Sequence, residues 1–351
     1  KLIMAFTTIN KSTDYFNTKL YTGTGATLNI TGLDFQPDFS WLKVRSNADN
    51  HALFDAVRGA TKRLASNLTA VESNRATALT SFNSDGFTLG DNSETNTNNY
   101  TYASWNWLGA NGTAANTDGD IASTVSANTT SGFSIVTYTG GNTNDSSDTV
   151  GHGLGVAPSM IITKVTNGTT GWIVGHKDIG WNNQLVLNTT DAVSFNNRSY
   201  GVNTNPTSSV YTVAQNGGDY ITNSSGTFVA YCFAEVQGYS KFGSYTGNGS
   251  ADGTFVYTGF KPAMMIVKNT SIVRDWQIFD NKRLGYNVDN NYLFPNLSDA
   301  EGTADRVDFL SNGFKWRTDA NTYNASGNNY IYMAFAEQPF VASNFNAATA
   351  R

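Results

Sequence analysis

The chain has 351 residues with a formal net charge of −5, and only 14 % of its residues are charged. Phosphate binding needs concentrated lysine and arginine, so this balance argues against a nucleic-acid partner. No run of 18 apolar residues is present, and the sequence therefore predicts no insertion into a membrane.

Polarity comes mainly from Asn, Thr, Ser and the 33 glycines, while aromatic residues make up 13 % of the chain. Threonine and aromatic side chains suit a pleated sheet, whereas asparagine and glycine accept the positive φ of tight turns. Strong helix formers are not prominent. The composition therefore favours an all-β fold of short antiparallel strands.

The first 15 residues form an N-terminal arm for which the sequence offers no counterpart in the rest of the chain. We expect this arm, residues 1–15, to pack on another subunit of a homo-oligomer, because symmetric assembly increases avidity. Met4 could be the natural first residue, which leaves open whether residues 1–3 are native.

After the arm, one pattern of motifs occurs three times with a period of about 105 to 120 residues. Each copy has a Tyr-Thr-Gly motif, then a proline, an apolar run and a lysine six residues after the proline. A period of this length is the size of a domain and exceeds that of a solenoid repeat. The motif sets are Tyr21-Thr22-Gly23 with Pro37 and Lys43, Tyr138-Thr139-Gly140 with Pro158 and Lys164, and Tyr245-Thr246-Gly247 with Pro262 and Lys268.

Later markers keep the same order in each copy. Each proline is expected to open a strand, where its missing N–H is tolerated. An Asn-x-Ser/Thr stretch follows, beginning at Asn67, Asn188 and Asn296. Each copy closes on an aromatic strand, in which we align Phe233 and Phe335 with Trp105.

These markers predict three tandem antiparallel β-sandwich domains arranged as a serial array. Strand patterns and turn spacing leave jelly-roll and concanavalin-like topologies open. A segment rich in Asn, Thr and Gly between the first two copies is interpreted as a linker, with room for one added strand. The expected boundaries are repeat 1 at 16–109, the linker at 110–131, repeat 2 at 132–238, repeat 3 at 239–341 and a C-terminal tail at 342–351.

Catalytic chemistry finds little support in the sequence. His51, His152 and His176 are neither near a Gly-x-Ser-x-Gly motif nor spaced as zinc ligands. Glu235 and Glu337 end equivalent strands of different copies, so we expect them to lie apart, held by donors of their own domains. No glycoside-cleaving pair of acids is predicted, and we interpret the protein as not being an enzyme.

Two loops cluster oxygen atoms that could bind calcium, and no other cofactor is indicated. One contains Asp118 and Asp120, and the other spans Asn142 to Asp148. Neither follows the EF-hand spacing, and Asp and Asn are also ordinary loop residues. The metal content therefore stays open. The single cysteine, Cys232, lies in an apolar strand pattern that favours burial.

Loops that differ between copies are the better candidates for binding a surface molecule. Trp105 and Trp107 alternate on one strand and are expected in the core. Trp181-Asn182-Asn183 stands in a polar stretch without a counterpart, which makes Trp181 the candidate exposed contact. Asn142 and Asp145, in the second polar loop, complete the predicted binding set.

Four groups of residues together carry a family resemblance: Met4-Ala5-Phe6-Thr7-Thr8-Ile9-Asn10-Lys11, the Tyr-Thr-Gly motifs, Gly151-His152-Gly153-Leu154 with Ala157-Pro158, and the run from Tyr330 to Phe340. They resemble the repeated β-sandwich domains of tail-fibre-like virion structural proteins of marine bacteriophages, cyanophages among them. The resemblance spans nearly the whole chain and implies a structural or adhesive role on a virion, outside the host cell. It supplies no catalytic residues.

The hypothesis from the sequence is a phage virion appendage, a tail-fibre-like protein that contributes to host-surface attachment. Its expected partners are other copies of itself, other virion proteins and a host-surface glycan or protein. Two alternatives remain. One is a capsid decoration or self-assembling filament protein, and the less favoured one is a polysaccharide depolymerase.

Overall fold

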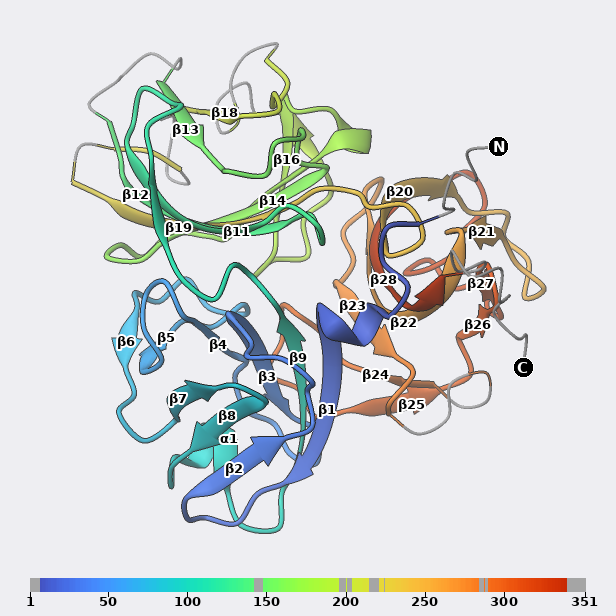
Figure 1. The fold of residues 1–351 in the computed structure, drawn as a ribbon. Coiled ribbons are helices and arrows are strands. Elements are labelled where there is room, and N and C mark those ends of the chain that lie inside the picture. Colours follow the sequence, from blue (N-terminus) through green and yellow to red (C-terminus); the bar gives the residue numbers. More distant parts are fainter. Residues whose placement is uncertain are drawn as a thin grey trace, which may run out of the picture.

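The computed structural model describes residues 7–141, 148–195, 200, 204–214, 221–223, 225–283, 287 and 290–339. Over these ranges the chain is all-β, with several antiparallel sheets, as predicted (Figure 1). The single α-helix in the described ranges, α1 (Ser93–Asn96), has only four residues. No described helix is long and apolar enough to cross a membrane.

The strands follow the three copies of the motif pattern, which we call copy one (16–109), copy two (132–238) and copy three (239–341). Copy one contains β1 (Phe16–Thr22), β2 (Leu28–Thr31), β3 (Phe39–Val44), β4 (Ala52–Asp55), β5 (Lys62–Arg63), β6 (Ser73–Asn74), β7 (Leu79–Asn83), β8 (Gly86–Leu89) and β9 (Thr101–Trp107). Copy two contains β12 (Phe133–Thr139), β13 (Asp148–Gly151), β14 (Met160–Val165), β15 (Ile173–His176), β16 (Asn183–Val186), β17 (Ser194–Phe195), β18 (Val210–Val213) and β19 (Thr227–Phe233). Copy three contains β20 (Ser240–Thr246), β21 (Phe255–Tyr257), β22 (Phe260–Asn269), β23 (Gln277–Asp280), β24 (Asn290–Tyr292), β25 (Gly302–Ala304), β26 (Val307–Leu310), β27 (Gly313–Trp316) and β28 (Asn329–Pro339).

Each copy contributes four strands in one shared order: first strand, last strand, proline strand and the strand after it. The orders are β1-β9-β3-β4, β12-β19-β14-β15 and β20-β28-β22-β23. A smaller sheet accompanies each of them, formed by β2-β8-β7, β13-β18 and β21-β27-β26. The motif repeat read from the sequence therefore corresponds to a repeated strand order.

The register of the proline strand is also shared, and it corrects one alignment. The residue two places after each proline pairs with the last strand as Phe39 with Trp107, Met160 with Phe233 and Met264 with Phe335. Trp107, and not Trp105, is thus the counterpart of the two phenylalanines. Pro37 and Pro158 precede their strands, whereas Pro262 lies within β22 at a shift of register.

The Tyr-Thr-Gly motif has one structural role in all three copies. Its tyrosine pairs across strands with a second ring, with centroid distances of 4.9, 5.1 and 4.8 Å in copies one, two and three. Each tyrosine hydroxyl also donates to a backbone carbonyl, of Thr95, Ile221 and Tyr323. A Cβ on the motif glycine would lie only 2.1 to 2.3 Å from another carbonyl oxygen, so no larger residue fits.

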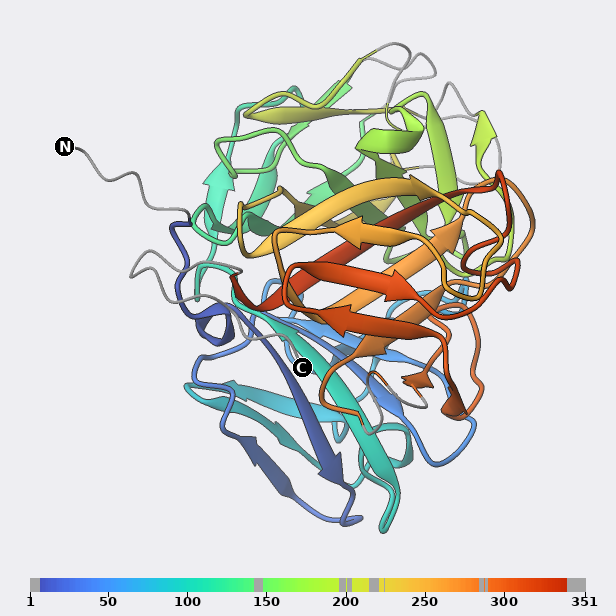
Figure 2. The same cartoon turned by 90° about the vertical axis from the view of Figure 1, so that its right-hand side faces the viewer.

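The three copies do not form a serial array, because they close around one common core (Figures 1 and 2). Three equivalent aromatic rings, Trp107, Phe233 and Phe335, meet pairwise edge to face at centroid distances of 6.3, 6.0 and 5.6 Å. Each copy touches both others at this point, so the arrangement has an approximate threefold axis. The opposite face of each four-stranded sheet packs a separate core of its own copy.

The predicted linker and arm both belong to this body. The 110–131 segment contains two strands, β10 (Ala114–Asn116) and β11 (Ser123–Asn128), which extend the sheet of copy two beyond β12. In the arm, Ile9 is buried in the common core of its own chain. The carbonyl of Tyr15 accepts a bond from Leu108 N, just as that of Tyr239 accepts one from Ala336 N. The described end of the arm thus has a repeat counterpart and packs within its own chain, contrary to the expectation.

Candidate functional site

The copies are joined by hydrogen bonds that repeat around the ring. In each copy an aromatic ring nitrogen bonds the backbone carbonyl two residues before the Asn-x-Ser/Thr asparagine of a neighbouring copy. The bonds join Trp172 Nε1 to Ala65 O (2.8 Å), Trp276 Nε1 to Val186 O (3.1 Å) and His51 Nε2 to Phe294 O (2.9 Å). Copy two reaches copy one, copy three reaches copy two and copy one reaches copy three, which closes the ring.

His51 is held as the neutral tautomer that this bond requires. Its Nδ1 accepts from Trp41 Nε1 at 2.8 Å, so Nε2 carries the proton given to Phe294 O. Burial, followed by the positive charge of Lys43, lowers the pKa of His51 well below the usual value. The histidine is therefore part of the junction between copies and is not placed as an acid or base.

The motif lysines form a second ring of contacts. Each lysine Nζ donates to the backbone carbonyl of the Ser or Thr that ends the Asn-x-Ser/Thr motif of a neighbouring copy. Burial lowers the pKa of Lys43 and Lys268 to about 8. The pairs are Lys43 with Ser298 (3.2 Å), Lys164 with Thr69 (3.1 Å) and Lys268 with Thr190 (3.0 Å). Two motifs that the sequence marked as repeated are thus the two halves of the junction between copies.

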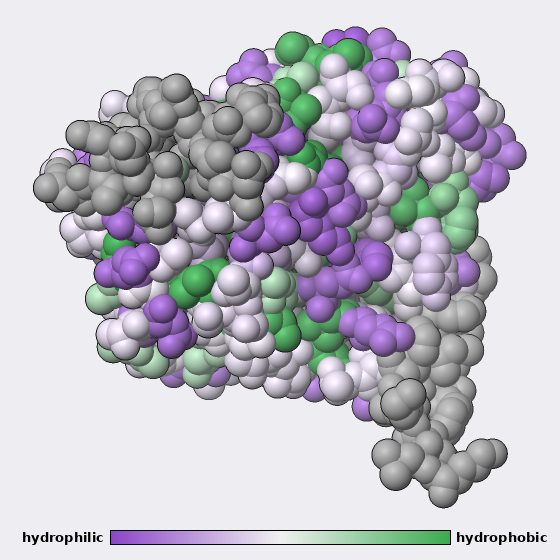
Figure 3. Space-filling view, turned by 90° about the horizontal axis from the view of Figure 1, so that it is seen from above, coloured by the Kyte–Doolittle hydropathy of each residue, from purple (hydrophilic) through white to green (hydrophobic). Residues whose placement is uncertain are grey.

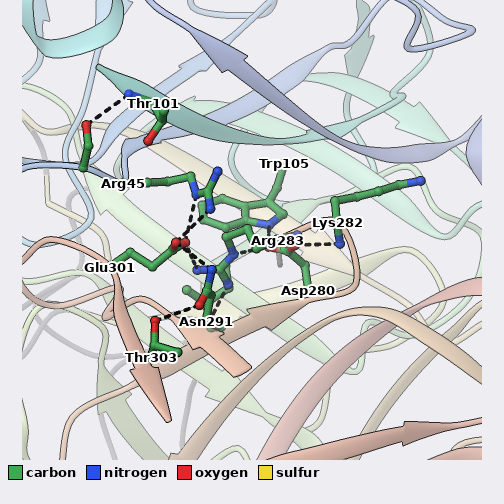
Figure 4. A network of polar contacts seen from close by, with 11 residues as sticks. Arg45, Thr101, Trp105, Asp280, Lys282, Arg283, Asn291, Glu301 and Thr303 are labelled. Atoms are coloured by element: carbon green, nitrogen blue, oxygen red, sulfur yellow. Dashed lines mark hydrogen bonds and ion pairs between the residues drawn. The ribbon is translucent and has the colours of Figure 1, made fainter. Parts of the chain in front are cut away.

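Copies one and three add a buried Asp–Arg–Glu cluster at the junction. In copy three, Arg283 Nε lies 2.6 Å from Asp280 Oδ2, and its NH1 lies 3.2 Å from Glu301 Oε2. From copy one, Arg45 binds Glu301 through two nitrogens, and Trp105 Nε1 donates to Asp280 at 3.0 Å (Figure 4). The charges are fully paired in the junction.

Copy one repeats this cluster against copy two. Arg58 bonds Asp55 at 2.6 Å and Glu72 at 3.1 Å, and the hydroxyl of Tyr231 donates to Asp55 at 2.8 Å. Burial lowers the pKa of Arg58, but the charge of Asp55 and further acidic contacts outweigh it and raise that pKa above the ordinary value. Asp55 and Asp280, matched in the sequence, are therefore fold-keeping residues.

Beside the copy-one cluster lies a hollow with a volume of about 540 Å³. We call it the insertion groove, because the 110–131 segment supplies part of its floor and one side. Arg58 and Glu72 of copy one and strands of copy two also line it. Its lining residues are Val57, Arg58, Glu72, Ala115, Ala122, Ser123, Thr124, Thr137, Tyr138, Thr139, Thr166, Thr227 and Phe228.

The floor of the insertion groove is a row of small side chains across three strands. Ala115 pairs with Thr124, and Thr124 pairs with Thr137, so all three project from one face of the sheet. Beside this row, the hydroxyls of Thr166 and Thr227 lie 2.6 Å apart. Because the only charged lining residues, Arg58 and Glu72, are paired with each other, the groove offers mainly hydroxyl and methyl groups.

The members of the predicted binding set that the structure describes do not form an exposed site. Trp181 is only 6 % exposed and packs edge to face on Tyr200 at 5.8 Å, so the expectation of an exposed contact is wrong. Asn183 donates to the carbonyl of Ile179 within its own loop. Asn182 is half-buried beside it. Asn142 and Asp145 lie outside the described residues.

The two glutamates that end equivalent strands line different hollows. Glu235 binds Lys177 at 2.7 Å and Lys241 at 2.6 Å, and Glu337 binds Lys261 at 3.0 Å. Burial raises the pKa of Glu235, but the two lysines outweigh burial, and its pKa is lowered. Lys241 belongs to copy three, so Glu235 is not held by its own copy alone.

The remaining candidates lie within the fold. His152 and His176 are buried, and burial lowers the pKa of both. Asp120 accepts bonds from the amide and hydroxyl of Thr149. In the described ranges, no group of three or more His, Cys, Asp or Glu side chains is placed to hold a metal ion. Cys232 is fully buried, and burial raises the pKa of its thiol.

The model of a domain of unknown function, DUF7483, matches residues 11–339. The chain belongs to this family. One family model covers all three copies, which accords with their closure around a single core. No curated protein and no solved structure matches the chain.

Sequence reasoning did not single out Arg58, Glu72, Thr124 or Thr137. A signal for the first two was present, since copies one and three share an Asp-x-x-Arg spacing and a glutamate three residues after the Asn-x-Ser/Thr motif ends. The threonines carried no comparable signal, because threonine is abundant throughout the chain.

Proposed function

We propose that this protein is a virion appendage of a bacteriophage, similar to a tail-fibre protein, which contributes to host-surface attachment without cleaving the surface molecule. The proposal places it outside the host cell, with other virion proteins and other copies of itself as partners. It also describes the three copies as β-sandwich domains that follow one another along the chain, with the 110–131 segment added to copy two. Support for the virion role comes from the family resemblance stated above.

A binding or structural role is favoured because the buried ionisable groups hold the copies together. Lys43, Lys268, Asp55, Asp280 and His51 all hydrogen-bond within junctions between copies. Groups committed in this way are not free to transfer protons to a substrate. Only 14 % of the residues are charged. On the face seen in Figure 3, apolar residues form small separate areas among hydrophilic ones.

Such a surface suits repeated reversible contact with a hydroxyl-rich coat. Uncharged hydrogen bonds are not screened by salt, whereas ion pairs at a surface are. A body with an approximate threefold axis is also rigid, because each copy is held by two neighbours, and a rigid presentation limits the entropy lost on binding.

The proposal is tested on purified particles of the phage that encodes this protein. Mass spectrometry should detect the chain in the particles, and immunogold labelling should place it on an appendage. Added protein should also reduce adsorption of the phage to its host. Label spread over the capsid would favour the decoration or filament alternative instead, and absence of the chain from the particles would overturn a virion role.

The non-enzymatic part has its own test. Purified protein incubated with host polysaccharide should release no reducing ends. Release that is abolished by Glu235→Gln or Glu337→Gln would establish a depolymerase and overturn this part of the proposal.

A further inference from the structure

We infer that the insertion groove binds a neutral oligosaccharide. The inference rests on the attachment role proposed above and gives that role a site and a ligand class. Three observations support it. The groove is formed by a segment that is not needed to join the three copies. Its floor presents hydroxyl groups without a hydrogen-bond partner in the described chain, and its charged side chains are paired with each other.

The 110–131 segment exists at only one of the two links between copies. Copies two and three are joined without any such segment, although their junction has the same kinds of backbone, indole and lysine hydrogen bonds. The strands β10 and β11 are therefore additional to closure. They extend the sheet of copy two past the common core, and the extension forms the floor and one side of the groove.

The junction between copies three and one differs at the place that corresponds to the groove. There, Arg45 stands where the groove has Thr166, and it binds Glu301, the counterpart of Glu72. Between copies one and two the hollow has a volume of about 540 Å³. Small-molecule sites in proteins occupy about 300 to 1,000 Å³, so the groove has the size of a ligand site.

The floor chemistry matches sugar hydroxyls. Thr124 is exposed, Thr137 is half-buried, and neither hydroxyl bonds another described part of the chain. A hydroxyl both donates and accepts, which is the pattern that a sugar hydroxyl needs from its partner. The methyl groups of the threonines and of Ala115 give the apolar patches on which the C–H face of a sugar ring can rest.

The charges of the groove disfavour an anionic ligand. Arg58 is held by Asp55 and Glu72, and Lys62 also approaches Glu72, at 3.6 Å. Two carboxylates and two cations leave no net positive charge to attract sulfate, phosphate or carboxylate groups. Glu72 still has carboxylate oxygens at the side of the groove that can accept bonds from sugar hydroxyls.

The test uses the full chain and a panel of neutral hexaoses, namely maltohexaose, laminarihexaose and mannohexaose, with dextran sulfate as the anionic probe. Saturation-transfer NMR with irradiation of methyl groups should show contact with at least one hexaose, and calorimetry should give its affinity. Dextran sulfate should not compete. No contact with any of the three hexaoses, or competition by dextran sulfate, would overturn the inference.

Two variants of one strand locate the site. Ala115→Trp places a large ring over Thr124 and should abolish binding, whereas Ala114→Trp, exposed on the other face of β10, should leave it unchanged. Thr124→Val and Thr137→Val should each weaken binding about fivefold, the effect of one lost hydrogen bond. Thr31→Val on β2 is the matched control. Equal binding by Ala115→Trp and wild type would contradict the inference.

Failure here is distinct from failure of the proposed function. If particles carry the chain on an appendage and the chain adsorbs to host cells, but Ala115→Trp adsorbs equally, attachment stands and the groove is not its site. Binding of an unstructured peptide without binding of any hexaose would likewise overturn the ligand class.

Discussion

Copies one and three close their junctions with buried charges, whereas copy two does so with a different set of side chains. Strand register places His176 where copies one and three have Asp55 and Asp280. The positions of Arg58 and Arg283 are taken in copy two by Ile179, and those of Glu72 and Glu301 by Val193. Tyr231 donates to Asp55, and Trp105 donates to Asp280. The counterpart of these two residues in copy three is Met333, which has no such donor.

The backbone contacts are the same despite this exchange. The amides of Glu72, Val193 and Glu301 donate to the carbonyls of Thr166, Thr270 and Arg45 in the next copy. The three copies are thus held together by backbone and lysine hydrogen bonds that all three junctions share. The buried charged cluster is an additional feature of two of these junctions. This agrees with the general finding that a complete buried ion pair adds little net stability, although a broken one is costly.

The largest expected effect comes from breaking one cluster. Arg283→Met leaves Asp280 buried without its cation, although Glu301 keeps Arg45, and should lower the free energy of unfolding by about 3 to 5 kcal/mol. Urea denaturation measures it. Ile179→Met, at the equivalent place in copy two, is the matched control and should cost under about 1.5 kcal/mol.

Replacing a whole cluster sharpens the same comparison. The triple variant Asp55→His, Arg58→Ile and Glu72→Val gives copy one the residues of copy two and removes all three charges together. It should be more stable than Arg58→Met alone, because no buried charge is left unpaired. A triple variant less stable than the single one would show that the charges are required for closure.

Acid should destabilise the junction between copies two and three by protonating His176. Burial lowers the pKa of His176 to about 4, below its value of about 6.5 in the unfolded chain. Between these values the unfolded state binds more protons, so stability is present above about pH 6.5 and falls, by roughly 3 kcal/mol, as the pH approaches 4. Against the effect of burial, the lysines that bind Glu235 lower its pKa, which moves its protonation toward lower pH.

The measurement is the unfolding free energy from pH 7 to pH 4, compared with His176→Asn. An asparagine side chain can still accept the bond that His176 Nδ1 takes from Asp178 N. This variant should lose part of the pH dependence, and the remainder should belong to His51 and His152, whose pKa values are also lowered by burial. An unchanged slope would exclude His176 as a source of acid sensitivity.

The hydrogen bonds donated by the indoles of Trp172 and Trp276 should contribute equally to the free energy of unfolding. Trp172→Phe and Trp276→Phe each remove the donor to a buried carbonyl, of Ala65 and of Val186. Each should cost about 1 to 3 kcal/mol. A much larger cost at one junction, seen in parallel denaturation curves, would mean that the ring is not closed uniformly.

The smallest effect is expected from the exposed member of the copy-one cluster. Lys62 is 42 % exposed, and its Nζ lies 3.6 Å from Glu72. Lys62→Met should change stability by about 0.5 kcal/mol or less. A cost comparable to that of Arg58→Met would contradict the distinction between buried and exposed charges.

The sequence by itself determined the all-β class and the three copies with their shared markers. Tyr-Thr-Gly, the proline strand and the closing aromatic strand were readable because they depend on local rules: ring pairing across strands, turns at glycine and alternation along a strand. Burial of Trp105 and Trp107 followed from the same alternation, and the structure confirms it.

Only the tertiary structure decided how the copies meet. Nothing local in the sequence shows that Lys43 reaches Ser298, or that Trp107, Phe233 and Phe335 share one axis, because these contacts join residues more than 90 positions apart. The exposure of Trp181 and the role of the 110–131 segment were misjudged for the same reason. A polar stretch reads as loop or linker, and whether it is buried or extends a sheet depends on the elements that the fold brings beside it.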